Sequence, residues 1–186
     1  VDRAAQQADQ IARLESWQGQ LWAILELQLR TRAQTAVLAP EQELPRAHEL
    51  SSEIRQNQVR IQQQTTSLAA NDLPRDDADA ADLQQTLTNL ANDPMQRAVA
   101  LAEKLTRIAH VTQAPQPVAE LGETQDAIIE VLQRLLQFTR RATAETLAEL
   151  DHRPGGDLPD DVQQKLRDLH DRLEEFLRQQ KRVIEA

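Results

Sequence analysis

The chain has 186 residues with a formal net charge of -9, only 2% aromatic residues, 4 Gly and no Cys. So few glycines exclude a fold of many short strands, whose turns need positive φ angles, and the acidic charge argues against a nucleic-acid-binding surface, which relies on clustered Lys and Arg. The lack of Cys excludes disulfides, thiolate metal sites and cysteine nucleophiles, and no apolar run approaches the ~20 residues that cross a bilayer.

Apolar residues at steps of three and four predict a first helix over residues 2–38, which Pro40 ends. In its middle, Trp17, Trp22, Ile24 and Leu27 widen the apolar stripe until most of the circumference is apolar. A surface helix does not tolerate this pattern, so we expect this helix at the centre of the molecule. The stripe itself consists of Ile11, Leu14, Leu21, Leu25 and Leu29.

A second helix is predicted to start near Pro45, which suits a first turn because it needs no N–H there, and to continue to about Ala69. Polar residues, among them Asn57, Gln58 and Thr65, occupy or flank its seam. Asn57 and Gln58 are interpreted either as devices that fix register or partner number, or, as the more ordinary reading, as part of a shallow and partly wet seam. The apolar stripe of this helix is Ala47, Leu50, Ile54, Ile61 and Leu68.

Residues 71–82 contain Pro74 and several Asp residues and are predicted to form a loop that leads into a third helix. The stripe of that helix keeps one heptad-like phase through Pro94. This continuity predicts one kinked helix, whereas Asn92 or Asp93 followed by Pro94 fits the start of a separate helix equally well. In both cases the axis bends. The stripe comprises Leu83, Leu87, Leu90, Ala98, Leu101, Leu105 and Ile108.

A proline connection at residues 114–117 leads into a fourth predicted helix, which has its first stripe residue at Leu121 and ends at Arg153. Residues 154–159, with two Gly and two Pro, form the most flexible predicted connection. A fifth helix follows over residues 162–183 and is predicted to lie antiparallel to the fourth.

These elements predict an all-α fold: an elongated bundle or coiled-coil-like array of about five long amphipathic helices joined by short turns with Pro or Gly. Residues 1–186 are predicted to form a single unit, because domain statistics favour one domain at this length. The chain begins without Met and ends in helical phase, from which we expect a piece of a longer protein. We also expect that protein to be bacterial.

Two groups of side chains resemble metal ligands, and neither is complete. Glu149 and His152 have the Glu-x-x-His spacing of di-iron bundles, but the chain has no second such pair. An acidic cluster lacks the Gly and Glu of a calcium-binding EF-hand loop, so helix capping explains it better. No phosphate-binding or nucleophile motif occurs, and no metal, cofactor or catalytic residue is predicted. The acidic cluster compared with the EF-hand loop consists of Asp76, Asp77, Asp79 and Asp82.

The pattern favours a non-enzymatic structural or protein-interaction module, a scaffold or spacer with a protein partner or self-association, and no nucleic-acid partner. The alternative is a helical domain that binds an apolar ligand or peptide between helices near Trp17 and Trp22. The predicted interaction surface is the centre of the first helix. We expect helices of the same chain to enclose it, since several are available; otherwise a partner or second copy covers it. This predicted interaction surface consists of Trp17, Leu21, Trp22, Ile24 and Leu25.

Overall fold

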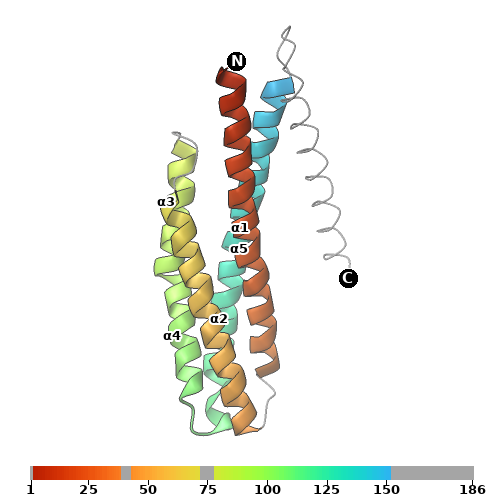
Figure 1. Ribbon diagram of the computed structural model, residues 1–186. Helices are drawn as coiled ribbons and strands as arrows, with labels where there is room; N and C mark the ends of the chain where they lie inside the picture. The colour runs from red at the N-terminus through yellow and green to blue at the C-terminus, as the bar shows by residue number, and fades with distance from the viewer. Residues whose placement is uncertain (1, 39–42, 72–77, 152–186) are drawn as a thin grey trace.

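The computed structural model describes residues 2–38, 43–71 and 78–151, and within these ranges nearly every residue is helical and none lies in a strand (Figure 1). The all-α prediction is confirmed. The predicted fifth helix and its hairpin with the fourth lie outside the described residues. The helices are α1 (Asp2–Leu38), α2 (Leu44–Ala70), α3 (Ala78–Asn92), α4 (Pro94–Thr106) and α5 (Pro115–Asp151), with a short 3-10 helix, η1 (Val111–Gln113), before α5.

The first two helices have the boundaries that the sequence pattern predicts. α1 spans 37 residues, which corresponds to about 55 Å at 1.5 Å per residue. α2 begins one residue before Pro45, whose missing N–H has no partner in a first turn anyway. It ends where Asn71 becomes extended and its N–H donates a hydrogen bond to the Leu68 carbonyl at 3.3 Å.

Two predicted boundaries are wrong. α3 begins at Ala78, inside the predicted loop 71–82, because acidic residues are favourable near the positive end of a helix dipole and do not oppose a helix there. α5 begins at Pro115, inside the predicted connection 114–117, because proline fits a first helical turn. The Val118 N–H closes that turn on the Ala114 carbonyl at 2.9 Å.

The bend near Pro94 is a break of one residue between two helices. α3 ends at Asn92 and α4 begins at Pro94, while Asp93 has φ -121 and ψ -76 and makes no side-chain cap. The backbone hydrogen bonds around it persist: the Asp93 N–H donates to the Asn89 carbonyl at 3.1 Å, and the Arg97 N–H donates to the Asp93 carbonyl at 2.9 Å. The apolar stripe therefore continues across two separate helices.

Four helical rods pack in the cyclic order α1, α2, α3 with α4, and α5. α1 packs against α2 and α5, and α4 packs against the other sides of the same two helices. One continuous cluster of buried apolar side chains contains residues from all five helices. Several polar contacts bridge the rods, including a hydrogen bond from His48 on α2 to the carbonyl of Ile108, just after α4, at 2.7 Å.

The bundle is closed around α4 and open beside α3. α4 packs closely on α5, whereas α3 barely touches α5. Figure 1 shows α2 and α3 diverging from α1 and α5 toward the end where α1 begins. We term the part around α4 the closed half and the part where α3 stands apart from α5 the fork. The fork leaves inward faces of α3 and α5 without a helix between them among the described residues.

Candidate functional site

The predicted interaction surface at the centre of α1 lies mostly inside the core. Trp17 is 4% exposed and Leu21, Ile24 and Leu25 are buried, while Trp22 is half-buried and packs against the same core. Residues of the same chain thus enclose this stretch, as expected for a self-contained bundle. A ligand or peptide that binds between helices here has to displace packed side chains.

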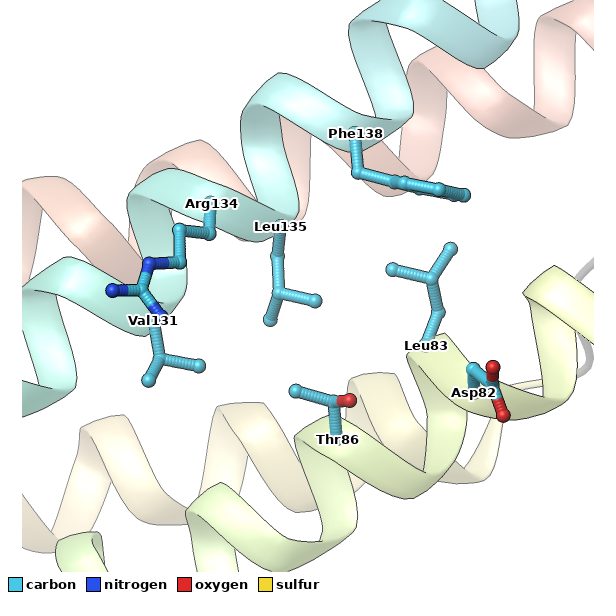
Figure 2. Close-up of a pocket in the computed structure, with 7 residues that line it drawn as sticks. All are labelled: Asp82, Leu83, Thr86, Val131, Arg134, Leu135 and Phe138. Carbon is cyan, nitrogen blue, oxygen red and sulfur yellow. The ribbon is translucent and has the colours of Figure 1, made fainter.

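A groove lies between α3 and α5, in the fork. One part has a volume of about 360 Å³, and an adjoining hollow of about 520 Å³ shares Thr86 and Val131 with it and extends to Asp93 and Pro94. Figure 2 shows side chains from both helices that face the first part. They are Asp82, Leu83 and Thr86 on α3, and Val131, Arg134, Leu135 and Phe138 on α5.

The groove follows from the apolar stripes of its two helices. Leu83 on α3 and Leu135 on α5 are 8% and 6% exposed, so the stripe residues at the bottom are almost covered. Phe138, one turn beyond Leu135, remains 37% exposed and is one of three large exposed apolar residues in the described part of the chain. Figure 2 shows its ring and Leu83 extending into the same space from opposite helices. The groove therefore has an apolar floor and a partly exposed aromatic side chain at one end.

The rim of the groove carries more acidic than basic side chains. Asp82 and Asp93 line the α3 side and are exposed. On α5, Arg134 forms an ion pair with Glu130 one turn earlier. The single basic side chain of the lining is thus already paired with an acidic neighbour. A bound partner meets an apolar floor with a net acidic rim.

The predicted metal candidates do not converge on this groove. No group of three or more His, Asp or Glu side chains suited to a metal occurs in the described part of the chain. Asp82 is exposed and lines the groove. Asp76, Asp77 and His152 lie outside the described residues, and only the backbone is described for Asp79 and Glu149. None of the described helices contains a stretch long and apolar enough to cross a membrane.

The resolved pKa shifts belong to two arginines outside the groove lining. A hydrogen bond with Asp126 raises the pKa of Arg32, and burial lowers the pKa of Arg140. The Arg32 guanidinium bridges α1 to α5 through two hydrogen bonds to the Asp126 carboxylate, at 2.8 and 3.0 Å. The Arg32 shift therefore reports on the α1–α5 contact, and neither shift assigns a proton transfer to the groove.

The sequence interpretation missed the groove because Leu83, Leu135 and Phe138 occupy ordinary stripe positions. Helix length was the available signal: α1 and α5 have 37 residues each, whereas α2 has 27. A shorter helix cannot cover the full length of a longer one. Part of the apolar stripe of a long helix therefore had to lack a neighbour among these rods. No protein-family model, curated protein or solved structure matches the chain, so its function is argued from the geometry of the groove.

Proposed function

We propose that the chain is a non-enzymatic protein-interaction module whose α3–α5 groove binds an amphipathic helix of a partner protein. The observation that carries the proposal is the apolar groove itself, with Leu83 and Leu135 at its floor and Phe138 partly exposed at its end. Two helices that stand apart with apolar faces offer the geometry of helix-in-groove recognition, in which a third helix inserts its apolar stripe. Such a helix extends the core of the closed half into the fork.

The rim determines the chemistry of the partner. Asp82 and Asp93 line the groove, and Arg134, the basic residue of the lining, is already paired with Glu130. A partner helix with Lys or Arg beside its apolar stripe complements this rim, whereas one with Glu or Asp there is repelled. The proposed partner is therefore a basic amphipathic helix.

The rest of the bundle supports a scaffold or spacer role. α1 and α5 are each about 55 Å long, and a continuous core joins all five helices. A long rod with internal packing holds the groove at a fixed distance from its other end. The proposed module thus combines a spacer with one binding surface.

A binding assay with a designed helix tests the proposal. The probe is a labelled synthetic peptide with Leu at heptad a and d positions and Lys beside them, and fluorescence anisotropy measures its binding. We expect Phe138→Asp to weaken binding about tenfold or more, because an aromatic side chain that a partner buries commonly contributes more than 1 kcal/mol. Val37→Asp is the matched control, since Val37 is 56% exposed and lies at the opposite end of the bundle.

Two results would contradict the proposal. Equal losses for Phe138→Asp and Val37→Asp would show that the peptide binds elsewhere, and equal binding of a Glu-flanked peptide would remove the electrostatic argument. Sedimentation tests self-association: dimerisation of the unmodified chain that Phe138→Asp abolishes would make a second copy, and not a basic helix, the occupant of the groove.

A further inference from the structure

The core contains three glutamines whose side-chain amides have no hydrogen-bond partner among the described residues. They are Gln28 on α1, Gln58 on α2 and Gln125 on α5, and each is 0% exposed. Buried polar groups are normally paired, since an unpaired donor or acceptor loses its bonds to water and gains nothing in return. We term these three residues the amide layer.

The other buried polar residues differ from the amide layer because most can bond within their own helix. On α2, the Ser51 hydroxyl donates to the Ala47 carbonyl at 2.6 Å, and the Thr65 hydroxyl donates to the Ile61 carbonyl at 2.9 Å. A glutamine side chain has no equivalent bond here. The same intrahelical bond is made by the buried threonines of α1 and α5, namely Thr31, Thr35, Thr124, Thr139 and Thr143.

Contacts between helices place Gln58 and Gln125 at one level of the bundle, and Gln28 about one and a half turns away toward the fork. Asn57 donates a hydrogen bond to Gln34 across α2 and α1 at 3.1 Å, and Arg32 pairs with Asp126 across α1 and α5 at 2.8 Å. The amide-layer residues on α2 and α5 are the immediate neighbours of Asn57 and Asp126 in sequence. The one on α1 lies about one turn from Arg32.

This level is also the base of the fork. On α5 the amide layer lies about one and a half turns before Val131, where the groove begins. On the rod formed by α3 and α4, two contacts with α2 lie on either side of this level: Gln62 with the Ala91 carbonyl, and His48 with the Ile108 carbonyl. They place the level just after the break at Asp93. An unpaired polar layer, a helix break and the end of the groove thus lie within about two helical turns of one another along the bundle.

We propose that this level is a pivot at which α2, a continuous helix over Leu44–Ala70, bends and moves with α3 relative to the arm formed by α1 and α5. The break at Asp93 lets α3 change direction without unwinding α4. The amide layer weakens the packing at that level, because water that enters as the arms separate hydrogen-bonds the glutamines. The closed half stays packed while the fork widens and narrows. The inference does not depend on the proposed partner helix.

Distances between spin labels test the pivot, and the absence of Cys in the chain allows clean labelling of introduced cysteine pairs. Gln85 on α3 and Gln137 on α5 report on the fork, and Ala100 on α4 and Glu123 on α5 report on the closed half; all four are exposed. We expect the fork pair to give the broader distance distribution, with a tail at long distances. Equally narrow distributions for the two pairs would overturn the proposal.

Substitutions in the amide layer connect this motion to its cause. Gln58→Leu combined with Gln125→Leu removes two unpaired amides, and we expect the long-distance tail of the fork pair to be lost. Gln56→Leu combined with Gln133→Leu makes the same chemical change at exposed positions of the same two helices and should leave the tail unchanged. A tail that survives the buried substitutions would show that the amide layer does not permit the motion.

A second variant keeps the proposal testable if the buried substitutions prevent folding. Asp93→Ala combined with Pro94→Ala favours one continuous helix across the break between α3 and α4. We expect this variant also to lose the long-distance tail, since α3 can then move only together with α4. A distribution identical to that of the unmodified chain would contradict a pivot at this level.

Discussion

The closed half and the fork are built from the same kind of apolar stripe, yet one is packed and the other is open. In the closed half, the inward residues of α4 (Met95, Ala98, Leu101, Ala102 and Leu105) are at most 4% exposed. In the fork, α5 continues its stripe to Phe138, which is 37% exposed. The difference lies in whether an opposing helix comes within reach. A heptad-like stripe thus specifies which face of a helix is apolar, and the arrangement of the neighbours decides whether that face becomes core or groove.

Two leucines on the same helix give the largest expected contrast. Leu121 is 0% exposed in the closed half and Leu135 is 6% exposed in the groove, both on α5. Leu121→Ala should lower the free energy of unfolding by about 3–5 kcal/mol, because a cavity in a rigid core cannot collapse. Leu135→Ala should cost about 2 kcal/mol or less, since the groove already leaves one side unpacked. Urea unfolding of both variants measures the difference, and equal losses would show that the fork is packed as tightly as the closed half.

The next effect concerns how the α1–α5 arm of the fork is held together. The side-chain amide of Gln18 on α1 donates a buried hydrogen bond to the Thr143 hydroxyl on α5 at 2.8 Å. Thr143→Val removes the acceptor and leaves the Gln18 amide unpaired, so we expect a loss of about 1–3 kcal/mol in thermal or urea unfolding. Thr112→Val is a control at an exposed threonine outside the helical core and should change stability little. A negligible loss for Thr143→Val would indicate that α1 and α5 separate here without cost.

The sequence was sufficient for the helices and insufficient for the groove. The three- and four-residue spacing of residues such as Leu21, Ile61 and Leu105 predicted all-α structure, because burial of one face is encoded in the chain itself. The expected central position of the first helix is wrong: α1 is one of four rods and packs against α2 and α5, and Leu29 of its predicted stripe is 42% exposed. The starts of α3 and α5 were misplaced, since Asp and Pro favour both loops and first helical turns. The groove depends on the angle between α3 and α5, which no local pattern encodes.

A smaller effect is expected from the ion pair that joins α1 and α5 beside the amide layer. Arg32 and Asp126 side chains are 32% and 57% exposed, so Asp126→Asn should cost only about 0–1 kcal/mol.

The pKa of Arg32 is raised by its hydrogen bond with Asp126. A cation whose pKa is raised in the folded state stabilises the fold at every pH below its unfolded-state pKa. This stabilisation is lost only as the pH rises through the folded-state pKa. Because the ordinary pKa of an arginine lies far above this range, we expect no loss of the Arg32 contribution between about pH 6 and 9. A double-mutant cycle with Arg32→Gln at both pH values checks this, and a coupling energy that falls toward pH 9 would disagree with it.

The smallest expected effect comes from the one glycine inside α5, where two opposing terms nearly cancel. An added Cβ at Gly122 would meet Cζ of Arg32 at 3.3 Å, so the glycine gives the guanidinium room to lie on α5 and reach Asp126. Gly122→Ala raises helix propensity by about 1 kcal/mol but forces the guanidinium to shift and weakens an ion pair of similar size. We therefore expect a net change in unfolding free energy within about 0.5 kcal/mol for the single substitution.

In an Arg32→Ala background the opposing contact is absent, and the same Gly122→Ala change should stabilise the chain by close to the full ~1 kcal/mol. The difference between the two backgrounds measures how far the ion pair, and not the backbone, accounts for the glycine at this position. A gain of equal size in both backgrounds would show that the Arg32 side chain yields freely and that the close approach of α1 to α5 beside the amide layer does not require the glycine.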